Sequence, residues 1–368
     1  MIEPIIRVEN LKKTFKVSKR ANGLPGRIAN LFFPKYEYKK AVDGISFNIL
    51  QGEAVGFVGA NGAGKSTTIK MLSGIIYPDE GNIEIAGFIP YKDRKKYVSN
   101  IGVVFGQKSQ LSWDLPVVDS FELLRRIYSI SDSVYKQNFE KFVDLLDMSS
   151  FINQPVRQLS LGQRMRADIA ASLLHSPRIV FFDEPTIGLD VVAKEKIRSF
   201  IRYLNKEQGV TIIFTTHDMQ DIEQTCERLI LIDKGHKIYD GSINGLVDAY
   251  AYEKKLVVEF MQDYTIDEIS DVLINDLEGH SKEFVFNPHK VSVKSVINNL
   301  SKYDIVDLTV ENMNIERIVR QILRRARSNY NECLFCVYNI ERIVRQILRR
   351  ARSNYNECLF CVYKDCIF

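Results

Sequence analysis

The sequence predicts an α/β fold in which buried strands lead into loops and helices. One observation is an apolar run over residues 54–58, followed by a glycine-rich loop over 59–67 and a helical pattern from 68 to 72. Another is the apolar run over 179–182, which ends in two acidic residues. Short apolar runs bounded by turn or polar residues are typical of buried strands. Both runs therefore indicate strands that carry functional groups at their ends.

The glycine-rich loop has the residues needed to hold a phosphate. It reads Gly59-Ala60-Asn61-Gly62-Ala63-Gly64-Lys65-Ser66-Thr67, which is the P-loop pattern. Its glycines let backbone N–H groups converge on one point, and the positive end of the next helix faces that point. In this pattern Lys65 reaches the β- and γ-phosphates and the Ser66 hydroxyl ligates Mg²⁺. We therefore expect the fold of a P-loop NTPase. The expected nucleotide-binding residues of the loop are Gly59, Asn61, Gly62, Gly64, Lys65, Ser66 and Thr67.

The second apolar strand ends in two carboxylates that could serve phosphate chemistry. Residues 179–182 are followed by Asp183 and Glu184. A P-loop enzyme places a carboxylate beside Mg²⁺ at the end of such a strand, and we assign that role to Asp183. Glu184 would polarise the attacking water as general base. Without the P-loop, a loop-capping acid would explain the pair equally well.

A short motif before this strand identifies the family that the chain resembles. Leu159-Ser160-Leu161-Gly162-Gln163 opens a helical pattern that runs to about residue 174. The motif resembles the signature motif of ATP-binding cassette (ABC) ATPases. Leu161 stands where the family usually has glycine, but Ser160 and Gly162 are kept. The resemblance implies that Ser160, Gly162 and Gln163 bind ATP.

Other positions resemble further motifs of the ABC family. Gln107 resembles the Q-loop glutamine that touches Mg²⁺, and residues 188–190 resemble the D-loop that crosses to a second subunit. His217 resembles the switch histidine that contacts the γ-phosphate. Alone, such a histidine would be explained as a cap or a satisfied polar residue. The resemblance implies Glu184, His217 and Gln107 as catalytic residues, and Ser66, Gln107 and Asp183 as the residues at Mg²⁺.

The adenine ring needs an aromatic partner, and the sequence offers three. Phe15 resembles the family's stacking aromatic, whereas a core position is its ordinary alternative. Tyr36 or Tyr38 could replace it, because a long insertion separates Phe15 from the next strand. We expect Phe15 to stack on the adenine.

The family resemblance also implies a two-chain catalytic site. The signature loop cannot fold back onto its own P-loop, so it completes the site of a second copy of the chain or of a homologous ATPase. Two chains would then hold two ATP molecules head to tail. Hydrolysis removes the link between them and the pair opens.

Three segments resemble a bacterial subgroup, the ATPases of ABC-2-type exporters, which work with integral-membrane permeases. The segments are residues 103–111, 113–116 and 159–166. In the family, a permease helix docks near residues 111–116, which contain Trp113. Packing of Trp113 within the helical lobe is the equal alternative.

Composition and length exclude several other classes. The 368 residues carry 50 basic and 46 acidic side chains, a net charge of +4 that does not demand nucleic acid as a partner. There is no apolar stretch of about 18 residues and no signal-peptide pattern at residues 1–4. We expect a cytoplasmic ATPase that lies on the inner face of the membrane through permease subunits. An ABC ATPase that acts on nucleic acid or ribosomes is the alternative.

The expected organisation has three parts. Residues 1–248 form the nucleotide-binding domain, with a helical subdomain at about 119–176 whose first helix Asp119 or Ser120 could cap. Residues 249–338 form a small α/β appendage with strands at 256–260, 283–286 and 306–310 and a helix between the last two strands. Residues 339–368 form a duplicated tail.

Two segments have unusual sequences. Residues 16–40 form a basic insertion, which we expect to be a solvated surface loop; a basic amphipathic helix is the alternative. Residues 314–338 are repeated without a change as 339–363. The repeat creates Cys-x-x-Cys pairs at 333–336 and 358–361, but their spacing is simply the repeat length, so we do not expect zinc.

Overall fold

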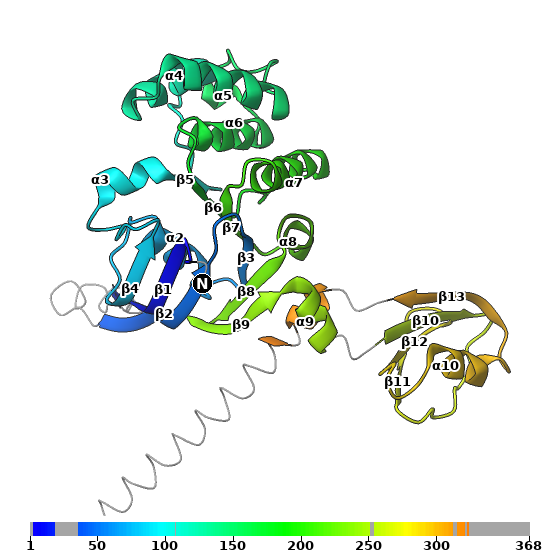
Figure 1. Ribbon diagram of the computed structural model, residues 1–368. Coiled ribbons are helices and arrows are strands. Elements are labelled where there is room, and N and C mark those ends of the chain that lie inside the picture. Colours follow the sequence, from blue (N-terminus) through cyan, green and yellow to red (C-terminus); the bar gives the residue numbers. More distant parts are fainter. Residues whose placement is uncertain are drawn as a thin grey trace, which may run out of the picture. The chain divides into compact units, whose positions relative to one another are not determined.

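The computed structural model describes residues 3–18, 36–106, 108–250, 254–311, 315–320 and 322–323. The chain divides into two compact units, Met1–Asn312 and Met313–Phe368. The described elements of the first unit are three sheets with their helices (Figure 1).

A six-stranded sheet carries the P-loop. Its strand order is β5-β6-β7-β3-β8-β9, in which the first five strands are parallel and β9 is antiparallel to β8. The strands are β5 (Ile101–Phe105), β6 (Ile179–Asp183), β7 (Thr211–Thr216), β3 (Ala54–Gly59), β8 (Arg228–Asp233) and β9 (His236–Ser242). β3 and β6 confirm the two predicted strands, and every residue of both is buried. Strands buried on both faces read as continuous apolar runs, which is why these two were visible in the sequence.

A three-stranded antiparallel sheet stands beside the first, with the order β2-β1-β4. Its strands are β1 (Ile6–Ser18), β2 (Tyr36–Ile49) and β4 (Glu80–Ile85). The expectation of a loop over the whole insertion is wrong at both of its ends, because Lys16 pairs with Tyr38 and Ser18 with Tyr36 in a β ladder. Residues 19–35, which include the alternative amphipathic helix, lie outside the described residues.

Helices α2 (Lys65–Leu72), α7 (Val191–Lys206) and α8 (Met219–Thr225) follow strands β3, β6 and β7 along the chain. α7 buries an apolar stripe formed by Ile197, Phe200, Ile201 and Leu204. Its first turn is capped by Asp190, whose side chain accepts a hydrogen bond from the Ala193 N–H at 2.8 Å. Two short helices, α3 (Arg94–Tyr97) and α9 (Ile243–Tyr250), complete this part.

Three helices form a lobe beside β5 and β6 (Figure 1). They are α4 (Val117–Ile127), α5 (Asp132–Leu145) and α6 (Leu161–Leu173). α6 confirms the helix predicted after the signature motif. The predicted cap of the first helix is wrong: α4 begins directly after Pro116, and Asp119 lies within its first turn. No side-chain cap is needed there, because the first N–H groups of α4, at Val117 and Val118, donate to the carbonyls of Gln154 and Ile152 at 3.2 and 3.0 Å.

The appendage elements form a four-stranded antiparallel sheet with the order β11-β12-β10-β13 and one helix, α10 (Val293–Leu300). The strands β10 (Lys254–Phe260), β12 (Ser281–Phe286) and β13 (Ile305–Glu311) confirm the three predicted strands. β11 (Val272–Asp276) was not predicted. Val296 and Leu300 of α10 are fully buried in the apolar core of this sheet. In the second unit, residues 315–320 and 322–323 are helical; the remainder of the repeat and its cysteine pairs lie outside the described residues.

Candidate functional site

A cleft of about 270 Å³ opens where the P-loop joins β3 to α2. It brings together residues from four separate parts of the sequence. These are Phe15, Lys39, Ala41, Asn61, Gly62, Gly64, Lys65, Ser66, Thr67 and Glu184. All the predicted loop residues except Gly59 thus line one cavity, and the backbone carbonyl of Gly59 is bonded to Lys65 within it.

The turn into α2 depends on glycine. Gly64 is the N-cap of α2 and has φ = 112°, which side chains rarely adopt. A Cβ at Gly64 would lie 2.5 Å from the backbone oxygen of Ala41. The first N–H groups of α2 therefore face the cleft without a side chain in front of them, which suits a phosphate.

Lys65 is held inside the loop that it closes. Its Nζ donates to the carbonyl of Gly59 at 2.7 Å and lies 4.0 Å from Oε1 of Glu184. The side chain is only 5% exposed. Burial lowers the pKa of Lys65, while the carboxylates of Glu184 and Asp183 oppose that shift. The amine is thus positioned at the floor of the cleft.

The hydroxyl and carboxylate predicted for Mg²⁺ are already in contact. Ser66 Oγ donates to Asp183 Oδ1 at 3.1 Å. Thr215 Oγ1, at the end of neighbouring strand β7, donates to the same oxygen at 2.7 Å. Magnesium prefers oxygen ligands and keeps several waters, so this pair of hard oxygen donors fits the ion. Thr215 was not singled out from the sequence.

Glu184 is set at a sharp turn beyond the end of β6. Its φ is 55°, in the left-handed region. Its N–H donates to Thr215 at the carbonyl (3.0 Å) and at Oγ1 (3.1 Å). The backbone of Gly106 packs closely against the same turn, because a Cβ at Gly106 would lie 2.2 Å from the backbone oxygen of Glu184. Oε1 of Glu184 lies 3.9 Å from Nδ1 of His217, which is 56% exposed. Strain held in place by surrounding contacts is common at functional sites.

Of the three aromatic candidates, Phe15 alone lines the cleft. Tyr36 and Tyr38 are 49% and 69% exposed, and Tyr36 instead lies under Nζ of Lys16 at 3.8 Å. Phe15 pairs with Lys39 across β1 and β2, so the hairpin also places a cation in the cleft. Lys39 was missed as a site residue, although it belonged to the basic insertion.

The signature residues do not line this cleft. Ser160 caps α6, accepting from the Gln163 N–H at 3.2 Å, and Gln163 Oε1 accepts from the Ser160 N–H at 2.9 Å. This capping box holds the exposed Ser160 at the positive end of α6. Leu161 lies against the D-loop, with its Cδ2 3.1 Å from where a Cβ of Gly188 would be.

Gln107 lies outside the described residues, but its neighbours are fixed. Gly106 donates to the carbonyl of Asp183 at 2.8 Å. Ser109 Oγ and the Gln110 N–H donate to Asp168 Oδ1 at 2.9 and 3.0 Å. Burial raises the pKa of Asp168 to about 6, against the opposing effect of these hydrogen bonds. The segment around Gln107 is therefore tied to β6 on one side and to α6 on the other.

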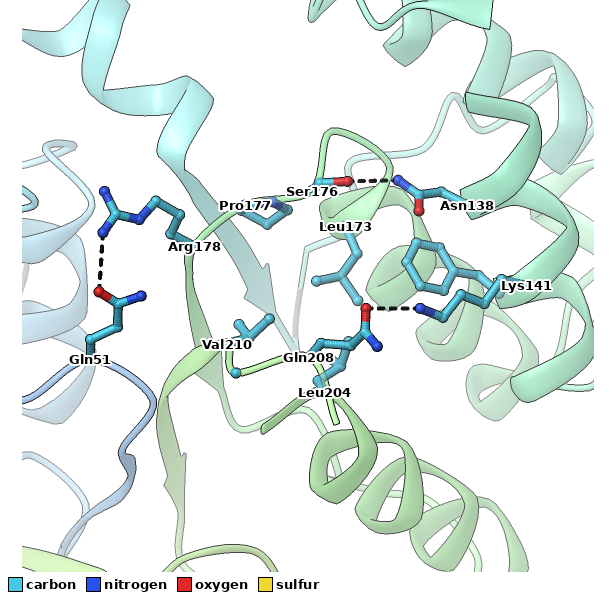
Figure 2. A pocket seen from close by; sticks show the side chains of 12 residues that line it. Gln51, Asn138, Lys141, Leu173, Ser176, Pro177, Arg178, Leu204, Gln208 and Val210 are labelled. Atoms are coloured by element: carbon cyan, nitrogen blue, oxygen red, sulfur yellow. Dashed lines mark hydrogen bonds between the residues drawn. The ribbon is translucent and has the colours of Figure 1, made fainter. Parts of the chain in front are cut away.

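A second cavity, of about 230 Å³, lies beside the residues that directly precede β6 and β7 (Figure 2). Its polar groups are bonded to one another. Lys141 Nζ donates to Gln208 at 3.0 Å, and Asn138 Nδ2 donates to Ser176 at 2.9 Å. These bonds hold α5 against the segments before β6 and after α7.

Comparisons with known proteins show the family of the chain. The family model described as ABC transporter matches residues 42–187. The "ABC transporter ATP-binding protein NatA" of Bacillus subtilis is 34% identical over 233 residues, which are 61% of this chain and 94% of NatA. The chain belongs to the ABC transporter ATP-binding proteins. This ABC cassette is therefore an ATPase with the fold of a P-loop NTPase.

Other relatives of this ABC ATPase extend the comparison. The "Linearmycin resistance ATP-binding protein LnrL" of Bacillus subtilis is 29% identical over 299 residues, covering 79% of this chain and 96% of LnrL. The "Nod factor export ATP-binding protein I" of Burkholderia pseudomallei is 34% identical over 220 residues, 58% of this chain and 70% of that protein. A dimeric post-hydrolysis structure of the ATP-binding cassette MJ0796, bound to ADP and Pi, matches 65% of this chain and 98% of MJ0796 at 27% identity, with a TM-score of 0.54. None of the helices in the described part of the chain has the length and apolar character required to span a bilayer.

Proposed function

We propose that this ABC ATPase is the motor subunit of a bacterial ABC-2-type exporter. It drives transport through separate permease subunits by ATP-dependent head-to-tail dimerisation. The observation that carries the proposal is the contact of Ser66 with Asp183 beside Lys65, with Glu184 held one residue further on.

The P-loop side of the site binds the triphosphate. Asn61, Gly62 and Thr67 line the cleft, and Lys65 at its floor would reach the β- and γ-phosphates. Ser66 and Asp183, with Gln107, would hold Mg²⁺. When bound, the ion neutralises charge on the phosphate oxygens.

The chemical step needs a base at the γ-phosphate. Glu184 is one residue beyond Asp183, and its carboxylate lies 4.0 Å from Nζ of Lys65. We assign it the role of accepting a proton from the attacking water. His217, whose Nδ1 lies 3.9 Å from Glu184 Oε1, would contact the γ-phosphate beside this carboxylate.

The signature loop belongs to the site of another chain. Ser160, Gly162 and Gln163 lie at the amino end of α6, away from the residues that line their own cleft. The exposed Ser160 and the positive end of α6 suit the γ-phosphate of an ATP bound by a second copy. The related cassette MJ0796 has been solved as a dimer, which supports this arrangement.

The exporter assignment is supported by relatives and by one surface. Two relatives are named for Nod factor export and linearmycin resistance. On this chain, Trp113 and Leu115 are 53% and 40% exposed just before α4. We assign this exposed apolar pair to contact with a permease, so that the ATPase lies on the cytoplasmic face of the membrane. Nucleic acid is not part of this proposal.

The assignment is tested by co-purification from detergent-solubilised membranes. The tagged chain should elute with an integral-membrane protein, and the double variant Trp113→Ala, Leu115→Ala should lose that partner while keeping its ATPase rate. Tyr77→Ala is the matched control, because Tyr77 is 62% exposed and lies outside this pair. Retention of the permease by the double variant would reject this docking surface.

A further inference from the structure

We propose that Asp221 is a positioning residue, which fixes the turn after β6 and the turn after β7 relative to one another. This inference rests on the proposed roles of Glu184 and His217, which stand on those two turns. Asp221 itself contacts neither the cleft residues nor the expected position of ATP.

The carboxylate of Asp221 is completely buried and accepts from both turns. One oxygen, Oδ2, accepts from Thr186 Oγ1 at 2.5 Å and from Thr216 Oγ1 at 3.2 Å. The other oxygen, Oδ1, accepts from Arg198 Nε at 2.6 Å. A single oxygen atom thus accepts from one hydroxyl in the turn after β6 and from another on the last residue of β7.

Those two hydroxyls stand immediately beside the proposed catalytic groups. Thr186 lies two residues after Glu184, in a turn closed by the hydrogen bond from the Ile187 N–H to the Glu184 carbonyl at 3.4 Å. Thr216 directly precedes His217, and its Oγ1 also accepts from the Asp218 N–H at 3.0 Å. Moving either hydroxyl would therefore move Glu184 or His217.

The charge of Asp221 is balanced by Arg198 on α7, which is 4% exposed. A buried ion pair gains little stability over apolar side chains of the same shape, because desolvation offsets the attraction. Arg198 donates to Oδ1, which leaves Oδ2 of Asp221 to accept other hydrogen bonds. A buried carboxylate oxygen without a hydrogen-bond partner would destabilise the fold. The partners of Oδ2 are the hydroxyls from the catalytic turns. The geometry points to alignment of these turns as the role of the carboxylate.

A plain link between α7 and α8 would need only Arg198 and Asp221. It would give Thr186 no part in hydrolysis. Thr186→Val removes one hydroxyl at constant shape and keeps the ion pair of Asp221 with Arg198. It therefore distinguishes alignment of the turns from a purely structural link between α7 and α8. Thr186→Ser restores the hydroxyl. Thr225→Val is the matched control. Thr225, on α8, is a buried threonine like Thr186, but its hydroxyl donates to the backbone carbonyl of Asp221, at 2.6 Å, and not to the carboxylate.

The experiment measures kcat, the Kd for ATP and the thermal midpoint of each full-length variant. We expect Thr186→Val to lower kcat by about tenfold, the loss of one hydrogen bond to a charged group, with the Kd for ATP changed less than about twofold. Thr186→Ser should recover most of kcat, and Thr225→Val should keep it. If Thr186→Val lowers only the thermal midpoint, Asp221 is a structural link and the inference is overturned.

A double-mutant cycle on kcat adds a second test. Because Thr186 and Thr216 share one oxygen, Thr186→Val and Thr216→Val should be strongly non-additive, whereas independent turns predict additive effects. Glu184→Gln, assayed alongside, separates the two hypotheses. If it abolishes hydrolysis while Thr186→Val has no effect on kcat, the proposed function stands and the positioning role of Asp221 fails. If Glu184→Gln keeps turnover, the assignment of Glu184 itself fails.

Discussion

Ser66 and Asp183 share a hydrogen bond of 3.1 Å although 117 residues separate them along the chain. The bond joins the first turn of α2 to the end of β6. Thr215 extends the link to β7. These two hydrogen bonds fix the Asp183 carboxylate against the P-loop hydroxyl, which is the kind of positioning that a preorganised site needs.

Glu184→Gln should bind ATP normally and lose hydrolysis. Glutamine keeps the shape of the side chain but cannot take a proton from water. We expect turnover to fall by at least about a hundredfold, the lower end of the contribution of general-base catalysis. Steady-state phosphate release measures the loss of hydrolysis, and calorimetry measures whether ATP binding is kept. Near-wild-type turnover of the purified variant would remove the assigned role.

Thr215→Val should lower kcat, and not only the stability of the folded chain. The variant loses the donor to Asp183 Oδ1 and one of the two acceptors of the Glu184 N–H, because the Thr215 carbonyl remains. We expect kcat to fall about tenfold or more, together with a higher Mg²⁺ requirement.

Thr211→Val is the control for that experiment, since Thr211 is fully buried at the other end of the same strand. Its Oγ1 accepts from the Gly52 N–H at 2.9 Å, far from the cleft. It should lose thermal stability and keep kcat per folded molecule. Equal catalytic losses in the two variants would argue that β7 acts only as a structural strand.

Lys65→Ala should lose nucleotide affinity. The ammonium group lies at the floor of the cleft, and a charge-assisted bond to phosphate is among the strongest polar contacts. We expect the Kd for ATP to rise at least about tenfold. Lys70→Ala, in the last turn of the same helix, should bind as the wild type does. Unchanged ATP binding by Lys65→Ala in calorimetry would count against the P-loop assignment.

Phe15→Ala should weaken ATP but not inorganic triphosphate. Stacking of a base on an aromatic ring contributes about 1–3 kcal/mol, so we expect ATP binding to weaken by a factor of about 5 to 140. Tyr38→Ala should have no effect, because Tyr38 is 69% exposed and does not line the cleft. Competition binding with both ligands checks this. An equal loss for triphosphate would mean that Phe15 shapes the loop rather than holding adenine.

Asp168→Asn should change how stability depends on pH. The pKa of Asp168 is about 6 in the folded chain because the carboxyl is buried, against an ordinary value of 3.8. The folded state therefore binds the proton more tightly, so this group makes stability fall as the pH rises from about 4 to 6. Asparagine removes that fall, which we place at about 2–3 kcal/mol. Urea midpoints at pH 4 to 7 should converge at low pH and separate above pH 6. Parallel curves for the two proteins would contradict the prediction.

The sequence predicted those parts of the site that are contiguous in the chain. The P-loop, the strand before Asp183 and the start of α6 each depend on neighbouring residues, and each pattern has a local physical cause. Three of the four strands of the appendage, β10, β12 and β13, were also visible, because their apolar residues stand close together.

What the sequence could not show depends on contacts between distant segments. Thr215 is an ordinary strand residue until β7 is placed beside β6, and Asp221 is an ordinary helix residue until both turns meet at it. The extension of β1 and β2 was hidden because residues 16–18 and 36–40 are stabilised by pairing with one another rather than by an apolar face. Lys39 entered the cleft through that pairing.

The most direct test of the central claim is a complementation assay between two inactive variants. Lys65→Ala disables the P-loop side of the site, and Gly162→Asp places a negative charge on the signature side. In a mixed dimer, one site combines both defects and the other combines neither. Our account predicts that each variant alone is inactive and that an equal mixture regains about a quarter of wild-type ATPase activity, since about half of the dimers are mixed and each has one intact site. A mixture that stays as inactive as its components, while still forming mixed dimers, would contradict a site shared between two chains.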